Sequence, residues 1–109
     1  MIKIREGFGG GEEIKEKILQ IDVNIHNNLK IIMDGSGDGK PWTATQIKKF
    51  ISTMITLLRA KIPLLKKFSN QIMVVKDEKR ISILEKILKT LDEVKPVDKS
   101  ILNLIKSIF

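Results

Sequence analysis

Basic side chains and hydroxyls cluster in the middle of the chain, and their chemistry is that of holding phosphate. Lysine and arginine neutralise phosphate charge, and the free N–H groups and hydroxyls at a helix N-terminus bind phosphate oxygens. Such contacts follow a nucleic-acid backbone without reading its bases. An ordinary solvated helix face is the alternative reading. The candidate nucleic-acid-binding residues are Lys40, Thr43, Thr45, Lys48, Lys49, Arg59 and Lys61.

The overall charge points to the same class of partner. The 109 residues carry 20 Lys+Arg against 13 Asp+Glu, a net charge of +7. This excess favours nucleic acid first and an acidic membrane or protein surface second, although lysine also serves solubility alone. Trp42 is the only good candidate for stacking on a base, so backbone or shape contact is favoured over sequence readout.

The residue types needed for catalysis are sparse. The chain has no cysteine and a single histidine, His26, in an Asn-rich stretch with no serine close by. A catalytic triad needs a base beside a nucleophile and a third group that orients the base. The carboxylates mostly alternate with lysine, which is typical of solvated helix faces. We therefore expect no enzyme activity and no cofactor.

The loop that begins at Asp34 matches the first half of an EF-hand calcium loop. Asp34, Ser36 and Asp38 fall at ligand positions 1, 3 and 5, and Gly39 falls at position 6. Position 12 is Thr45 instead of the bidentate glutamate. A simple turn is the favoured interpretation, and weak calcium binding is the alternative.

The N-terminus carries glycines in place of an apolar leader. Gly7 and Gly9 to Gly11 predict a flexible arm over residues 1–11, ahead of a single domain over 12–109. A phosphate-binding loop would need a preceding strand and a Lys-Ser/Thr pair, whereas Glu12 and Glu13 follow the glycines. No apolar run is long enough to span a membrane, so a cytoplasmic location is expected.

The element that positions most of the basic residues is a helix from Thr43 to Lys61. Thr43 and Gln46 form a capping-box pattern, and an apolar stripe at helical spacing follows. Pro63 either kinks this helix or begins a short helical piece that ends near Phe68 or extends to Val74.

Three further helices are expected around it. One runs from Glu12 to the stop at Asp34, with a possible break near Asn27 and Asn28. Another begins at Asp77 as N-cap and ends near Val94, and the last follows Asp98 and covers residues 99–109. The pattern predicts an all-α fold, a small bundle of four to five helices.

Two segments resemble a known family. Pro41-Trp42-Thr43-Ala44-Thr45-Gln46-Ile47-Lys48-Lys49-Phe50 is similar to the segment that opens a central helix in the small subunit of type III (Csm-type) CRISPR effector complexes. The stretch from Leu57 to Phe68 is loosely similar to a later helix of that family, and residues 75–94 occupy the place of its next amphipathic helix. The resemblance covers about residues 40–94.

The resemblance implies a non-catalytic helical subunit of a ribonucleoprotein. Copies would coat guide RNA and target RNA through backbone contacts, and would pack against other effector-complex subunits and against each other. Lys48 and Lys49 would contact the nucleic acid, with Arg59 as a further contact.

A helical protein-interaction adaptor is the alternative function. Leu102, Ile105, Ile108 and Phe109 have a spacing similar to that of a sliding-clamp-binding peptide. The usual glutamine is replaced by Leu102, and packing against the core also explains the stripe.

Overall fold

Helices make up nearly all of the described chain. A computed structural model describes residues 2–35, 37, 39–91 and 95–109, with side chains from residue 12 onward. Over these residues it contains no strand and four helices, α1 (Ile2–Asp34), α2 (Ala44–Lys67), α3 (Gln71–Thr90) and α4 (Lys99–Ile108). The all-α prediction is confirmed, with four helices and not five. The predicted arm over residues 1–11 lies outside the residues whose side chains are described and stays a prediction.

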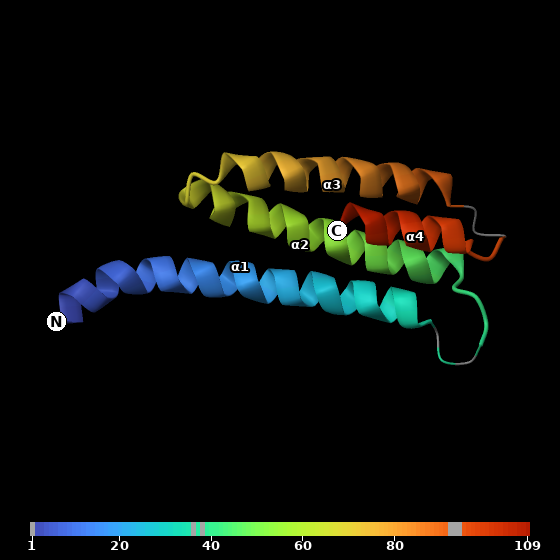
Figure 1. Cartoon of the computed structure of the whole chain (residues 1–109), viewed down its shortest axis with the longest axis horizontal. Coiled ribbons are helices and arrows are strands. Elements are labelled where there is room, and N and C mark those ends of the chain that lie inside the picture. Colours follow the sequence, from blue (N-terminus) through green and yellow to red (C-terminus); the bar gives the residue numbers. More distant parts are fainter. Residues whose placement is uncertain (1, 36, 38, 92–94) are drawn as a thin grey trace.

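Helices that follow one another along the chain run antiparallel (Figure 1). Helix α2 packs on α1 and on α3, while the short α4 contacts both α1 and α3. Helix α4 has ten residues and α2 has 24, so α4 accompanies only part of the length of its neighbours. Figure 1 shows α1 reaching well past the turn between α2 and α3, and the molecule measures 59 × 27 × 18 Å.

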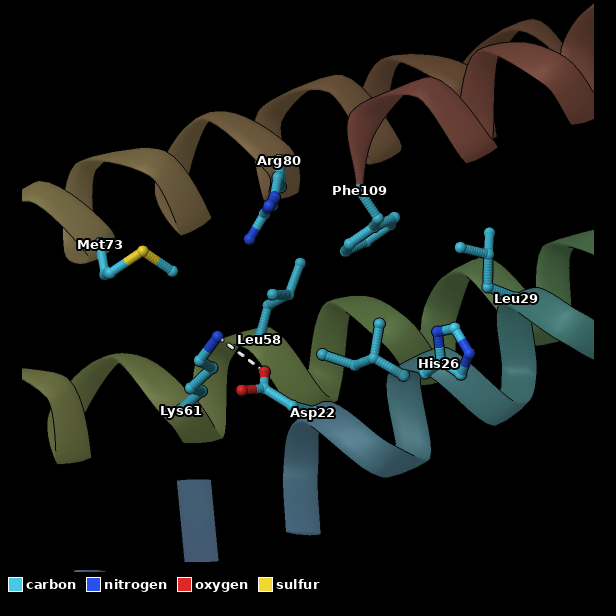
Figure 2. A pocket seen from close by; sticks show the side chains of 9 residues that line it. Asp22, His26, Leu29, Leu58, Lys61, Met73, Arg80 and Phe109 are labelled. Atoms are coloured by element: carbon cyan, nitrogen blue, oxygen red, sulfur yellow. Dashed lines mark ion pairs between the residues drawn. The ribbon is translucent and has the colours of Figure 1, made fainter. Parts of the chain in front are cut away.

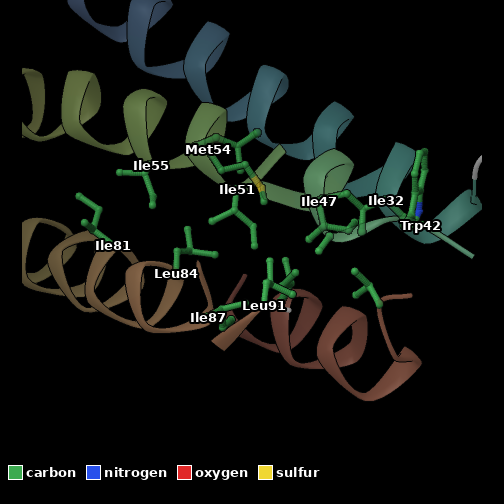
Figure 3. Packing of buried hydrophobic residues seen from close by; sticks show 14 of the residues in the cluster. Ile32, Trp42, Ile47, Ile51, Met54, Ile55, Ile81, Leu84, Ile87 and Leu91 are labelled. Atoms are coloured by element: carbon green, nitrogen blue, oxygen red, sulfur yellow. The ribbon is translucent and has the colours of Figure 1, made fainter. Parts of the chain in front are cut away.

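The core is aliphatic and is built on the predicted stripes (Figure 3). Ile47, Ile51, Met54 and Leu58 of α2 have no exposed surface, because their spacing of three and four places them on one side of the helix. Each of the other helices adds one apolar residue that is as fully buried: Ile32 of α1, Leu84 of α3 and Ile105 of α4.

Helix α1 is continuous through Asn27 and Asn28, so the possible break there does not occur. The Asn28 side-chain amide donates to the Asn24 carbonyl at 2.9 Å, one turn back in the same helix. This local hydrogen bond ties a weak helix former to the helix itself.

The boundary between α2 and α3 differs from the prediction. Helix α2 continues through Pro63 to Lys67, so the separate short helix is wrong. The chain then turns through Ser69, whose φ is 55°, and the Asn70 N–H donates to the Leu65 carbonyl. Asn70 is the N-cap of α3, because its side chain accepts from the Met73 N–H at 3.3 Å.

Asp77 is therefore not an N-cap but a buried residue inside α3. Helix α3 ends at Thr90, before residues 92–94, which lie outside the described part of the chain. Asp98 caps α4 as predicted, since its carboxylate accepts from the Ser100 N–H at 3.1 Å.

The two connections at the opposite end of the bundle are joined through Trp42. The indole N–H donates to the Ile32 carbonyl at 2.9 Å, in the last turn of α1. The Val97 N–H donates to the Trp42 carbonyl at 2.9 Å, and the indole packs edge-on against Phe50 with ring centroids 5.4 Å apart. The start of α2 is thus held between the end of α1 and the approach to α4.

Candidate nucleic-acid interface

The predicted capping box is present at the start of α2. The Thr43 hydroxyl oxygen accepts from the Gln46 N–H at 3.2 Å, and the Gln46 side-chain oxygen accepts from the Thr43 N–H at 3.0 Å. The Thr43 oxygen is thereby engaged in the cap. Thr45, in the first turn, is exposed to solvent.

Helix α2 contains basic residues and no acidic ones. Its 24 residues include Lys48, Lys49, Arg59, Lys61, Lys66 and Lys67, and neither Asp nor Glu. Successive residues turn by about 100° around the helix axis. Residues about two or five positions away from a member of the buried stripe therefore point to the opposite side of the helix. That outer face is exposed and combines cations with small hydroxyl side chains: Thr45, Lys49, Ser52, Thr53, Thr56 and Lys67.

Most of the predicted contact residues lie near the first turns of α2. Lys40 is exposed in the preceding loop and Lys49 is exposed on the outer face, while Lys48 is half-buried. Lys40 and Lys48 also take part in interactions within the protein. Arg59 lies on the same helix about 15 Å beyond Lys49. Its exposed guanidinium pairs with Glu85 of α3 at 3.2 Å, which directs it toward the α3 side.

Lys61 is not on the outer face, and its placement there is wrong. Its side chain is 4% exposed, and its ammonium lies 2.7 Å from Asp22 of α1 and 3.5 Å from Asp77 of α3. The cause is its position in the helix: Lys61 follows Leu58 by three residues and precedes Leu65 by four, so it belongs to the buried stripe.

Trp42 is also unsuited to the role of a base-stacking residue. Its side chain is buried between the end of α1 and Phe50, and its N–H is bonded to the Ile32 carbonyl. The outer face of α2 therefore carries no aromatic ring, and its polar groups match phosphate and sugar more closely than base edges.

A buried network of charges joins all four helices. Asp77 is fully buried; its Oδ1 accepts from Arg80 at 2.8 Å, and its Oδ2 faces the Lys61 ammonium without a hydrogen bond. Arg80 also donates to the Ile108 carbonyl at 3.1 Å and lies 5.2 Å from the centre of the Phe109 ring. With Asp22 on α1, the network reaches every helix, and Figure 2 shows the Lys61–Asp22 ion pair together with Arg80 and Phe109.

Sequence reasoning missed this network. The spacing of Asp77 and Arg80, one turn apart, is a local signal for their pair. The pairing of Lys61 with Asp22 and Asp77 depends on how three helices pack, so no local pattern marks it.

A cavity of about 260 Å³ lies beside the network (Figure 2). His26 lines it from α1, Leu58 from α2, Met73 from α3 and Phe109 from the end of α4. Its lining includes no serine, threonine or cysteine, so His26 has no hydroxyl or thiol nucleophile beside it there.

The loop after α1 gives no further support to a calcium site. Ser36 and Asp38 lie outside the described residues, and Asp34 is exposed at the end of α1. Gly35, Gly37 and Gly39 have φ values of 92°, 86° and 75°, the left-handed region that glycine enters readily. Within the described part of the chain, no group of three His, Cys, Asp or Glu side chains is placed to hold a metal.

Comparison with known protein families, curated proteins and solved structures finds no match. Among the described helices, none has the length and apolar character to cross a membrane.

Proposed function

We propose that this chain is a non-catalytic RNA-coating subunit that contacts the phosphate backbone through the outer face of α2. The observation that carries the proposal is the composition of that face. The outer face carries Lys49 and Lys67 among the hydroxyl side chains of Thr45, Ser52, Thr53 and Thr56, and helix α2 contains no acidic residue. A phosphate chain therefore meets cations and small side chains, with no carboxylate on this helix to repel it.

The setting we propose is a type III CRISPR effector complex, on the resemblance of residues 41–50 to the family's small subunit. In that setting, copies of the chain follow guide RNA and target RNA and pack against other subunits. The capping box supports the resemblance of residues 41–50 to the small subunit at one point, because Thr43 and Gln46 fix the start of the helix that carries Lys48 and Lys49.

The adaptor alternative receives less support from its own residues. Ile105 is fully buried, and Phe109 lies against Arg80. The motif that would bind a partner is largely occupied within the chain.

The proposal is tested by RNA titration at several salt concentrations. Two single-stranded RNAs of equal length and unrelated sequence are bound with similar affinity, and affinity falls as salt rises. The double variant Lys48→Glu/Lys49→Glu binds at least about tenfold more weakly and has a shallower salt dependence, because each lost phosphate contact removes counterion release.

The matched control is Lys99→Glu/Lys106→Glu, which changes the net charge equally on exposed residues of α4. Because this control changes only the general charge of the chain, its RNA affinity is expected to fall by no more than about twofold. Equal loss in both double variants, or no salt-sensitive RNA binding at all, contradicts the proposal.

A further inference from the structure

Helix α3 lies at one edge of the bundle and packs on α2 and α4 (Figure 1). Val74, Ile81 and Leu84 are buried on its inner side. At about 100° per residue, the residues within about 60° of Lys79 around the helix axis point away from the bundle. Those with an aliphatic or basic side chain are exposed and form what we call the basic-aliphatic face: Ile72, Val75, Lys76, Lys79, Ile83 and Lys86.

The aliphatic residues of this face are open to solvent. Ile72 is 82% exposed, Val75 is 44% exposed and Ile83 is 37% exposed. Ile72 and Ile83 are separated by about 17 Å along the helix, with Val75 between them. Single apolar residues scattered over a surface are ordinary, whereas several on one helix face form a patch that favours contact with an apolar phase.

The lysines of the same face give it a positive charge that no carboxylate on it neutralises. The exposed acidic residues of α3, Glu78 and Glu85, lie about 100° and 120° from Lys79 around the helix axis. Glu85 is also paired with Arg59 of α2 at 3.2 Å. The sequence that leads into this face, residues 39–76, contains neither Asp nor Glu. The charge of the face is therefore complementary to an anionic partner.

The aliphatic residues discriminate between two anionic partners. The outer face of α2 combines cations with hydroxyl side chains, which suits phosphate and sugar in water. The basic-aliphatic face combines cations with Ile and Val, which an RNA backbone would leave unpartnered. At the surface of a bilayer, by contrast, aliphatic side chains enter the boundary between headgroups and acyl chains, and lysine ammonium groups stay at the level of the headgroups.

We propose that the basic-aliphatic face binds the surface of an anionic lipid bilayer, with α3 parallel to the membrane plane. Ile72, Val75 and Ile83 enter the headgroup region, and the three lysines contact anionic headgroups. The contact is peripheral and reversible, because the face offers only three aliphatic side chains. It uses no residue of α2, so it goes beyond the RNA-binding proposal and does not depend on it.

The test sediments the full chain with two kinds of vesicle, phosphatidylcholine alone and phosphatidylcholine mixed with phosphatidylglycerol. Binding to the mixed vesicles is expected, and it falls as salt rises, because salt screens the attraction between lysine and anionic headgroups. The neutral vesicles are expected to bind at least about tenfold more weakly, because they lack this attraction.

A change of the aliphatic residues separates insertion from charge alone. Ile72→Gln/Val75→Gln keeps the net charge and is expected to lower the affinity for mixed vesicles roughly tenfold, because less apolar surface leaves water. The matched control is Leu19→Gln/Val23→Gln, which alters α1 residues that are 62% and 42% exposed. Its affinity is expected to stay within about twofold, because these residues lie outside the basic-aliphatic face.

A change of the lysines tests the electrostatic part. Lys79→Gln/Lys86→Gln is expected to weaken binding to mixed vesicles roughly 20-fold, because each lysine near an anionic surface contributes about fivefold. Lys99→Gln/Lys106→Gln makes the same change of net charge on exposed residues of α4. This control is expected to weaken binding by no more than about threefold.

Three results overturn the proposal. They are equal binding to neutral and mixed vesicles, equal loss in either altered pair and its control, and loss of RNA affinity in Lys79→Gln/Lys86→Gln without vesicle binding by the unaltered chain, which assigns the face to nucleic acid. RNA affinity of Ile72→Gln/Val75→Gln is expected to stay within about twofold, because its charge is unchanged. Failure of this proposal and failure of the RNA-binding proposal are therefore distinguishable.

Discussion

At the scale of single residues, Lys61 and Asp77 are charged groups that the fold removes from water. Such burial costs free energy that a single partner rarely offsets, so buried charges need several. Asp77 has Arg80 at 2.8 Å and Lys61 at 3.5 Å, and Lys61 has Asp22 at 2.7 Å. Asp22 differs from the others in being 47% exposed, and water therefore shares in its solvation.

This difference predicts unequal costs for two similar changes. Asp77→Asn leaves Lys61 and Arg80 with less compensation in a buried site and is expected to lower the free energy of unfolding by about 3 kcal/mol. Asp22→Asn weakens the shorter ion pair of the buried Lys61 ammonium, but Asp77 remains and the half-exposed side chain at position 22 stays in contact with water, so the change is expected to cost less, about 1–2 kcal/mol. Urea denaturation followed by circular dichroism measures both.

The exposed pair of Arg59 and Glu85 supplies the comparison. Glu85→Gln is expected to cost less than about 0.5 kcal/mol, because both side chains are largely in water. Similar losses for Asp77→Asn and Glu85→Gln would show that the buried network contributes nothing special to stability.

The sequence contained part of the information about Lys61. Its spacing from Leu58 and Leu65 puts it in the buried stripe, and only its charge argued for the outer face. The partners that make burial tolerable, Asp22 and Asp77, are 39 and 16 residues away along the chain. Periodicity thus gave the direction of the side chain, and the packing of α1 and α3 explains how its charge is accommodated.

At the scale of the helices, α2 continues through a proline. Pro63 has no N–H to donate to the Arg59 carbonyl, and its ring crowds that carbonyl. The helix persists because Leu58, Lys61 and Leu65 are buried on either side of the proline. Tertiary contacts therefore outweigh the local cost.

Replacement of the proline is expected to stabilise the chain. Pro63 is exposed, so Pro63→Ala removes no buried surface and restores the hydrogen bond to Arg59, with an expected gain of about 1–3 kcal/mol in the free energy of unfolding. Thermal and urea unfolding measure the gain. Ser52→Ala, also on the outer face of α2, is the control and is expected to gain only about 0.5 kcal/mol. A loss of stability in Pro63→Ala would indicate that α2 needs the proline for its shape.

Helix boundaries were predictable where the signal is local. Thr43 with Gln46 and Asp98 with Ser100 are caps closed within three residues, and the sequence identifies both. The start of α3 was missed because Asp77 has the residue type of an N-cap. Its burial beside Lys61 and Arg80 explains its presence inside the helix, whereas Asn70 provides the cap.

At the scale of the whole molecule, packing is uneven from one end to the other. The end that contains α4 has Ile25, Ile32 and Trp42 buried together, and the loops there are joined by hydrogen bonds. The end that contains the turn between α2 and α3 has Leu19, Phe68 and Ile72 exposed. Regions with few buried apolar contacts open more readily than the rest of a fold.

Hydrogen exchange is expected to reveal this gradient within a single helix. Amides of α1 over residues 14–21 should exchange at least about tenfold faster than those over residues 25–32, although both stretches are helical. Peptide-resolved exchange measured by mass spectrometry makes the comparison. Uniform protection along α1 would contradict an unevenly packed bundle.

The charge network that spans the four helices also constrains how this sequence can evolve. A substitution at Lys61 alone leaves Asp77 underneutralised in the core, and a substitution at Asp77 alone does the same to Lys61 and Arg80. Relatives that keep this fold should therefore retain these positions together or replace them together with apolar residues. The exposed lysines of α2 carry no such linkage, so the positions that hold the bundle and the positions proposed to contact RNA are free to diverge at different rates.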